Sequence, residues 1–381
     1  MIPYGRQDIQ QADIDAVTEV LTSPFLTQGP MIPRFEEAIC AATGAAHAVA
    51  VNSATSALHI AYMALDLGPG DWLWTCPNTF VATANAGLYC GAQVDFVDCD
   101  PRTYNMSVPA LSAKLEAAKI TNTLPKIVSV VHFAGQSADM KAIAALAKAY
   151  GFTVVEDASH AIGGSYDGQP VGNCAYSDIC VFSFHPVKIV TTAEGGAATT
   201  QSEDIATKLE LYRSHGVTRR CDLMRNQDPD PWYYEQITLG YNYRMTDIHA
   251  ALGITQMTRL AKYVDRRHEI MAQYNTALAD LPLVLPYQSS DQRSALHLYP
   301  VQVTEHNRRE VFDTLRTAGL GVNVHYIPVH LQPYYRDLGF VEGSFPHAEA
   351  YYRKAISLPM FPTMTDDDFD HVITSVKAAL A

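Results

Sequence analysis

The stretch that decides the fold is Ser183-Phe184-His185-Pro186-Val187-Lys188-Ile189-Val190-Thr191-Thr192-Ala193-Glu194-Gly195-Gly196, where one lysine lies between a polar turn and a Gly-Gly pair. A strand-like run, residues 179–182, precedes it. No carboxylate lies within five residues of Lys188 on either side, and its neighbours are apolar or hydroxyl-bearing. Loss of surrounding water disfavours the ammonium form, so this setting predicts a lowered pKa for Lys188. A neutral amine can attack a carbonyl, which makes Schiff-base chemistry the hypothesis to weigh against an ordinary surface lysine.

The composition predicts a globular protein that acts in the cytoplasm. Of 381 residues, 48% are hydrophobic and 18% charged, and no apolar run is long enough for a membrane helix. The first residues lack the basic-then-apolar layout of a signal peptide. The seven cysteines form no Cys-x-x-Cys pair, so we expect no disulfide frame and no metal site. A formal net charge of −13 argues against nucleic acid as a partner.

Strand-like and helix-like segments alternate through the first two-thirds of the chain. Strands are expected at residues 48–51, 72–75, 94–97, 127–131, 152–155 and 179–182, with helices at 7–21, 32–42, 54–67, from 80 onward and at 140–150. Repeated units of this kind predict an α/β fold with a mostly parallel central sheet between layers of helices. We expect a large domain with an N-terminal arm over residues 1–255 and a small α+β domain over 256–381.

The regular alternation of strand-like and helix-like segments ends in the second part of the chain. Residues 245–269 are predicted to form one long helix that leads into the small domain. Within that domain the patterns predict strands at 297–303 and 321–326 and helices at 308–318 and 366–380. Residues 213–235 show no hydrophobic period, and a loop of that length indicates a functional cover or a linker.

Four polar or aromatic features fall where parallel strands should end. The turn Ser53-Ala54-Thr55 opens a helix directly after a strand, a geometry that binds phosphate but also occurs as a simple helix cap. Asp157 and Ser183 end two other strands, and Phe80 lies at a helix start. Together with Lys188 these are the parts that a pyridoxal 5′-phosphate (PLP) site requires: an imine-forming amine, a carboxylate for the ring nitrogen, a phosphate cradle and a ring cover.

Seven ordered blocks of sequence carry a resemblance to a known family. They are residues 26–29 (LTQG), 52–58 (NSATSAL), 80–85 (FVATAN), 156–161 (EDASHA), 183–196, 240–245 (GYNYRM) and 325–328 (HYIP). Over essentially its whole length the chain resembles the DegT/DnrJ/EryC1/StrS sugar aminotransferases, which are fold-type I PLP enzymes. Residues 2–9 and 183–196 are most similar to the enzymes that aminate a UDP-linked 4-keto-6-deoxy-N-acetyl-hexosamine at C4 in pseudaminic acid biosynthesis.

The resemblance implies a role for each matching residue. It implies that Lys188 is the imine-forming lysine and general base, that Asp157 pairs with the pyridinium nitrogen, and that His160 lies near the 3-hydroxyl of PLP. It assigns the cofactor's phosphate to Ser53, Ala54, Thr55 and Ser183, with Ala54 and Ser183 also facing the substrate, and it stacks Phe80 on the cofactor ring. Asn242 is expected to reach the phosphate of the partner subunit in a homodimer with shared active sites. The nucleotide-sugar pocket is expected to be lined by Tyr4, Phe25, Leu26, Thr27, His325, Tyr326, Ile327 and Pro328.

The expected reaction transfers the amino group of L-glutamate to the keto sugar nucleotide. Another keto position, C3 or a different C4 sugar, is the first alternative. A PLP-dependent sugar dehydratase is disfavoured, because related dehydratases carry histidine at the lysine position, which here is Lys188. A non-catalytic regulator is disfavoured by the intact Lys188 and Asp157 and by the negative net charge. We interpret His185 as a surface or supporting group and His325 and His330 as a pair that binds no metal.

Overall fold

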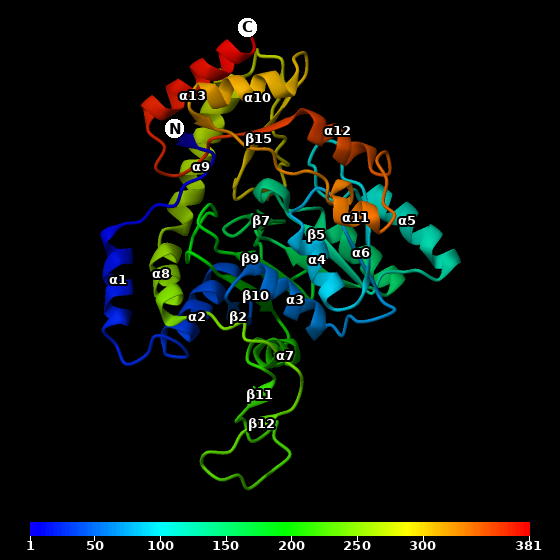
Figure 1. Ribbon diagram of the computed structural model, residues 1–381, viewed down its shortest axis with the longest axis vertical. Coiled ribbons are helices and arrows are strands. Elements are labelled where there is room, and N and C mark those ends of the chain that lie inside the picture. The colour runs from blue at the N-terminus through cyan, green and yellow to red at the C-terminus, as the bar shows by residue number, and fades with distance from the viewer.

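The structure of the protein, a computed structural model, describes residues 1–381 and is built on a seven-stranded sheet (Figure 1). The strands lie in the order β2-β10-β9-β6-β5-β3-β4. Their bounds are β2 (His47–Val51), β3 (Trp72–Thr75), β4 (Gln93–Phe96), β5 (Ile127–Val131), β6 (Thr153–Asp157), β9 (Ile179–Ser183) and β10 (Gly196–Thr200). β10 runs antiparallel to both neighbours, and every other neighbouring pair is parallel. The mostly parallel sheet confirms the predicted fold class.

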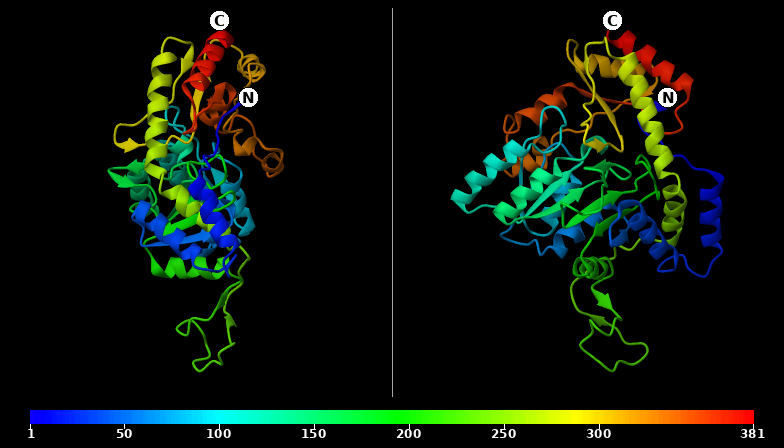
Figure 2. Two further views of the ribbon diagram at one scale, coloured as in Figure 1. Left: turned by 90° about the vertical axis from the view of Figure 1, so that its left-hand side faces the viewer. Right: turned by 180° about the vertical axis from the view of Figure 1, so that it is seen from behind.

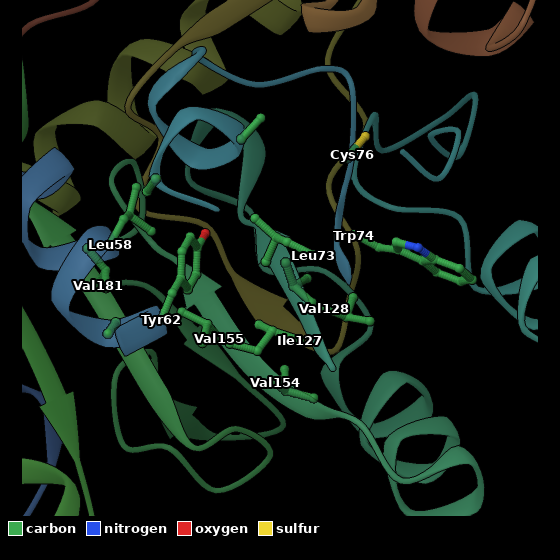
Figure 3. Close-up of a cluster of buried hydrophobic side chains, with 14 of the residues drawn as sticks. Leu58, Tyr62, Leu73, Trp74, Cys76, Ile127, Val128, Val154, Val155 and Val181 are labelled. Atoms are coloured by element: carbon green, nitrogen blue, oxygen red, sulfur yellow. The ribbon is translucent and has the colours of Figure 1, made fainter. Parts of the chain in front are cut away.

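Apolar side chains of the central strands pack against helix α3 (Ala54–Ala64) (Figure 3). Leu58 and Tyr62 of α3 face Val155 and Val181 of the sheet, and all four are almost fully buried. Each such side chain contributes about 1.5–3 kcal/mol through burial. Because α3 is buried on nearly every side, its sequence is apolar all round and shows little amphipathic alternation. This packing fixes the start of α3 beside the carboxyl ends of β6 and β9.

The remaining helices of the large domain cover both faces and one flank of the sheet (Figures 1 and 2). They are α1 (Gln11–Leu21), α2 (Met31–Thr43), α4 (Ala82–Tyr89), α5 (Val108–Thr121), α6 (Met140–Tyr150), α7 (Glu203–Arg213) and α8 (Asp247–Met257). α1 lies against α8 on the flank. Asp13 of α1 is buried and joins the two helices, because Thr255 of α8 donates to its carboxylate over 2.5 Å. Arg259, just after α8, donates to the same carboxylate over 2.6 and 2.8 Å.

The small domain forms a separate hydrophobic core at the top of Figure 1. A three-stranded antiparallel sheet, ordered β13-β15-β17, packs against three helices and includes the buried Tyr274 and Tyr299 in its core. Its elements are β13 (Leu283–Val284), β15 (Tyr299–Val303), β17 (Ala355–Leu358), α9 (Leu260–Ala277), α10 (Arg308–Thr317) and α13 (Asp366–Ala379). Short elements complete this part of the chain: η2 (Val329–Leu331), α11 (Pro333–Asp337) and α12 (Pro346–Lys354).

The first strand pairs with a strand of the small domain. β1 (Ile2–Pro3) pairs in parallel with β16 (Leu320–Gly321), and Ile2 packs against the core of the small domain. The sequence interpretation assigned these residues to the large domain, because a two-residue strand carries no periodic signal. The expected domain boundary near residue 255 lies close to the junction of α8 and α9, and it stays a prediction.

Three expectations about elements are wrong. Residues 245–269 do not form one helix, because α8 ends at Met257 and α9 begins at Leu260. The strand expected at 321–326 stops at Gly321. Residues 213–235 are not wholly a loop: β11 (Val217–Thr218) pairs antiparallel with β12 (Glu235–Gln236). Residues 217–236, which we call the arm, project away from the body of the molecule in all three views (Figures 1 and 2).

A second small sheet and a short turn complete the molecule. β7 (Ser165–Tyr166) pairs with both β8 (Gln169–Pro170) and β14 (Gln292–Arg293), and η1 (Phe133–Gly135) follows β5. β14 thereby links a loop of the small domain to the segment after β6. None of the helices has the length and apolar character needed to cross a membrane.

Candidate active site

A cavity of about 450 Å³ opens at the carboxyl ends of β6 and β9. The fold brings to its wall most of the residues that the sequence singled out: Tyr4, Ser53, Ala54, Thr55, Phe80, Asp157, His160, Ser183, Lys188, His325 and Tyr326. These residues come from the N-terminal strand region, the large domain and the small domain. The site therefore depends on how the two domains meet.

Lys188 lies in the turn after β9 and is half-buried in this cavity. Its backbone amide donates to the carbonyl oxygen of His185 over 2.9 Å, which closes the turn. The ammonium group forms no ion pair. Burial lowers the pKa of Lys188 to about 8, and the attraction of Asp157 opposes this only in part. The shift has the direction predicted from the sequence, so a substantial share of the amine is neutral near pH 8.

Asp157, the last residue of β6, is held by three donors. The Thr83 hydroxyl donates to Oδ2 over 2.6 Å. The hydroxyl and the backbone amide of Ser159 donate to Oδ1 over 2.5 and 3.2 Å. The side chain is 95% buried, so these bonds replace the water that a carboxylate loses on burial. Its orientation toward the cavity is fixed before any ligand arrives.

The amino end of α3 offers donors that the chain does not use. The amides of Ala54 and Thr55 begin the helix and have no intrahelical acceptor. The hydroxyls of Thr55 and Ser183 line the cavity and make no hydrogen bond within the chain. Gly196 of β10 allows this approach, because an added Cβ would lie 2.5 Å from the Ala54 nitrogen. Free amides, free hydroxyls and the positive end of the helix dipole favour an anion here.

Ser53 serves the helix rather than the cradle. Its hydroxyl oxygen accepts from the Ser56 amide over 3.1 Å and lies 3.0 Å from the Ser56 hydroxyl. The Ser56 hydroxyl in turn donates to Asn52 over 2.6 Å. Because Ser56 already uses its own proton, the Ser53 hydroxyl both accepts and donates within the cap. The structure therefore supports the helix-cap alternative for this side chain.

Three buried histidines, His160, His297 and His325, have lowered pKa values to which the charge of Lys188 contributes, which favours their neutral form. Burial lowers the pKa of His160 well below its usual value, and the charge of Lys188 adds to this effect. Burial likewise lowers the pKa of His325 to about 3 and that of His297 well below its usual value. The His160 and His297 rings lie 4.4 Å apart. A peptide bond in the cis form joins His325 to Tyr326, and the Tyr4 ring lies 5.0 Å from that of His325.

Six predicted site residues do not line the cavity: Phe25, Leu26, Thr27, Asn242, Ile327 and Pro328. The loop before α2 is held to the start of α8, because Asp247 accepts from the amides of Gly29 and Met31 over 2.8 and 2.9 Å. Phe25 and Leu26 are about half exposed there. Asn242 is also exposed. Asn242 was expected at the phosphate of the partner subunit, and the assignment of the other five residues to the nucleotide-sugar pocket stays a prediction.

Sequence reasoning missed several residues that line the cavity or, like the buried Thr83, support its wall from behind. Thr83 lies inside a quoted block, and its hydroxyl at helical spacing from Thr79 was the available signal. Ser159 follows Asp157 by two residues, a spacing that allows a side chain to bond back to its neighbour. His185 was interpreted as a surface or supporting group; it is exposed and lines the cavity beside Val187. Asn323 also lines the cavity, and nothing in its sequence context marked it.

The site fits PLP on its own geometry. The free donors at the start of α3 suit a phosphate, and Asp157 is oriented to accept a hydrogen bond from a protonated ring nitrogen. Lys188 carries the amine with a lowered pKa. Phe80, with 60% of its surface exposed, offers an uncovered ring at the cavity, 6.3 Å from the Tyr326 ring. No group of three or more His, Cys, Asp or Glu side chains could hold a metal ion.

The fold and this cavity together define a PLP-dependent aminotransferase. The model of the DegT/DnrJ/EryC1/StrS aminotransferase family matches residues 7–377, and the chain belongs to that family. A solved structure that shares the fold is the PLP form of a putative sugar aminotransferase from Streptococcus pneumoniae, with 29% identity, a TM-score of 0.88 and full coverage of both chains. The resemblance found in the sequence is thereby confirmed.

Relatives of known name cover nearly the whole chain. A spore coat polysaccharide biosynthesis protein of Bacillus subtilis is 42% identical over 99% of this chain and 96% of its own length. The UDP-4-amino-4,6-dideoxy-N-acetyl-beta-L-altrosamine transaminase of Campylobacter jejuni is 39% identical over 97% of this chain and 94% of its own. The structure of an aminotransferase from Helicobacter pylori involved in pseudaminic acid biosynthesis has a TM-score of 0.91 at 31% identity, covering 100% and 99% of the two chains.

Proposed function

We propose that this protein transfers the amino group of L-glutamate to the C4 keto group of a UDP-linked 4-keto-6-deoxy-N-acetyl-hexosamine. The observation that carries the proposal is a half-buried lysine with a pKa of about 8, in one cavity with an oriented buried carboxylate and an unused phosphate cradle. The transaminase of Campylobacter jejuni and the aminotransferase of Helicobacter pylori support the choice of substrate. The spore coat relative favours one second candidate, another keto nucleotide sugar.

The chain's own groups supply binding and proton transfer. PLP, when bound, links to an amine and delocalises the electron pair that remains when a Cα proton leaves. The α3 amides with Thr55 and Ser183 would hold its phosphate, Asp157 its ring nitrogen, and Phe80 would cover one ring face. Lys188 Nζ, once released from its link to the cofactor, would take the proton from Cα of the amino donor and return it on the cofactor side. The buried wall keeps the neutral amine available near pH 8.

We also propose a homodimer with shared sites that acts in the cytoplasm. Asn242 and Phe25 are exposed in one chain although the family resemblance assigns them to the site, and the arm extends far beyond the body. A second copy related by twofold symmetry would use these surfaces, and the partner subunit's Asn242 would then reach the phosphate cradle. All seven cysteines are free, as expected for a protein kept in a reducing compartment.

A substrate panel tests the proposed reaction. The PLP-loaded enzyme is incubated with L-glutamate, and loss of the yellow colour of the cofactor reports the first half-reaction. Keto nucleotide sugars with the keto group at C3 or C4 are then added, and the products are separated by mass spectrometry. We expect an amino sugar from the UDP-linked 4-keto-6-deoxy-N-acetyl sugar, and a ketodeoxy product without nitrogen would contradict the proposal.

Mixing two inactive variants tests the shared site. Lys188→Ala and Asn242→Ala are each expected to lose most activity as separate homodimers. In a mixed dimer one site would carry both changes and the other neither, so co-refolding or co-expression should restore up to half of the wild-type activity per mixed dimer. The matched control mixes Lys188→Ala with Asp157→Ala, which lie in the same chain's cavity and should show no recovery. Recovery in neither mixture, or in both, would argue against a site shared in this way.

A further inference from the structure

A chain of hydrogen bonds leads from the backbone through two side chains of the cavity wall. The Ala134 amide donates to Nδ1 of His160 over 3.3 Å. Nε2 of the same ring lies 3.0 Å from the hydroxyl oxygen of Tyr326. The His160 and Tyr326 rings are nearly parallel, at 17°, so the contact is made edge to edge between two fixed planes. His160 belongs to the large domain and Tyr326 to the small one, and this contact joins them at the cavity.

The first bond decides the tautomer of His160. An amide donor requires a lone pair on Nδ1, so a neutral ring must carry its proton on Nε2. The ring is 95% buried, and burial lowers the pKa of His160 well below its usual value, so the neutral form prevails. The Nε2 proton therefore points to Tyr326. In that bond the tyrosine hydroxyl oxygen is the acceptor, so the hydroxyl proton is free to be donated to another group.

Nothing else in the chain accepts that proton. His160 is the sole hydrogen-bond partner of the Tyr326 hydroxyl. Burial raises the pKa of Tyr326, and Tyr4 and Asp157 raise it further, so the hydroxyl keeps its proton over the working pH range. The side chain lines the cavity and is flanked by the rings of Phe80 and Phe133 at 6.3 and 6.4 Å. Tyr326 is partly exposed at the cavity, so its remaining proton is available to an acceptor on a molecule bound there.

We propose that Tyr326 is a catalytic residue whose hydroxyl, oriented by His160, donates a hydrogen bond to an oxygen atom of the molecule bound in the cavity. This inference rests on the proposed function. The oxygen belongs either to the PLP ring or to the sugar, and the chemistry required is the same: an acceptor with partial negative charge. His160 is then a positioning residue, because its ring nitrogen is already occupied by Tyr326 and acts on the ligand through it.

The test removes one oxygen atom and measures two affinities. For Tyr326→Phe, titration of the apoenzyme with PLP and of the PLP-loaded enzyme with UDP-N-acetylglucosamine is followed by absorbance and calorimetry. We expect one of the two Kd values to rise about tenfold to a hundredfold, the loss typical of a bond to a charged or partly charged group. A rise for PLP identifies the cofactor's oxygen, and a rise for the nucleotide sugar identifies the sugar's.

Tyr299→Phe is the matched control. Its hydroxyl is also buried and donates to Asn275 over 2.6 Å, but it lies in the core of the small domain. Both variants should unfold at similar temperatures, and Tyr299→Phe should keep both affinities. If Tyr326→Phe keeps both Kd values within twofold of wild type, the inference is overturned while the proposed function stands. If wild-type protein itself takes up no PLP, the proposed function fails first and the inference falls with it.

A double-mutant cycle tests the positioning role of His160. In a His160→Leu background the tyrosine loses its orienting donor, so the added Tyr326→Phe change should weaken binding by less than threefold. His160→Gln, which keeps an N–H donor near the position of Nε2, should recover part of the affinity that His160→Leu loses. An equal loss from Tyr326→Phe in both backgrounds would show that the two residues act independently. It would overturn the proposal that His160 positions Tyr326.

Discussion

Replacing Gly196 by alanine would disturb the phosphate cradle without touching a residue that binds ligand through its side chain. An added Cβ would lie 2.5 Å from the Ala54 nitrogen, 2.6 Å from the Ser53 carbonyl carbon and 2.7 Å from Ala54 Cα. All three are backbone atoms, so no side chain can rotate away. Since ordinary contact begins near 3.4 Å, β10 and the start of α3 must separate by about 0.9 Å at the closest pair.

The size of the effect follows from this displacement. Overpacking of this kind costs about 1–3 kcal/mol, which corresponds to a fall of roughly 2–10 °C in the unfolding temperature. The amides of Ala54 and Thr55 move with the helix, and hydrogen bonds to a charged group are each worth about 1.5–3 kcal/mol. We therefore expect the Kd for PLP to rise about tenfold to a hundredfold in Gly196→Ala.

Titration of the apoenzyme with PLP, followed by absorbance, measures this Kd, and calorimetry measures the unfolding temperature. Gly68→Ala is the matched control, because its added Cβ would meet nothing within 4 Å and its φ is not positive. It should change neither quantity appreciably. PLP affinity in Gly196→Ala equal to that of Gly68→Ala would refute the assignment of the α3 start as the phosphate cradle.

Three further predictions follow from the residues of the site and their supporting contacts. Thr83→Val removes the hydrogen bond to Oδ2 of Asp157 and should lower kcat about tenfold or more, whereas Thr83→Ser should keep most of the wild-type kcat. Steady-state kinetics that show no loss in the valine variant would contradict the role of this hydrogen bond. Because the pKa of Lys188 is lowered to about 8, the ammonium form dominates below that pH and the neutral amine above it. The rate at which the apoenzyme captures PLP should therefore rise about tenfold per pH unit from pH 6 to 7.5 and level off above pH 8. A flat pH profile in stopped-flow absorbance would contradict this prediction. Lys188→Ala should keep the fold by circular dichroism but lose the colour of the covalently held cofactor and the turnover, whereas transamination near the wild-type rate would remove Lys188 from its role.

Strands rich in β-branched residues were predictable from the sequence, and β10 was not. The run Ile127–Val131 is strongly apolar and lies in the middle of the sheet, as its composition indicates. β10 reads Gly-Ala-Ala-Thr-Thr, with no large apolar residue, although all five residues are buried. Its small side chains are set by the close approach of α3 at Gly196, a contact between segments more than a hundred residues apart. Local composition cannot report such a contact.

The site divides along the same line. Lys188, Asp157 and the α3 turn were recognisable because each lies at or just after the carboxyl end of a strand, where topology alone brings side chains together. Whether each remaining predicted residue lines the cavity depends on tertiary contacts. Asp247 draws the loop with Phe25 and Leu26 toward α8, and Ser56 occupies the hydroxyl of Ser53. The break between α8 and α9 carries no proline or glycine; Arg259, at the start of α9, bonds instead to Asp13, more than two hundred residues earlier.

The arm carries a tryptophan whose fluorescence can report association of the subunits. The chain has only three tryptophans, and two of them, Trp72 and Trp74, belong to β3. The third, Trp232, is carried on the arm with 72% of its surface exposed. If a second subunit covers the arm, the emission of Trp232 moves to shorter wavelength while that of the two sheet residues stays constant. A dilution series read by intrinsic fluorescence would then follow association of the subunits without any label, and Trp232→Phe would silence the signal.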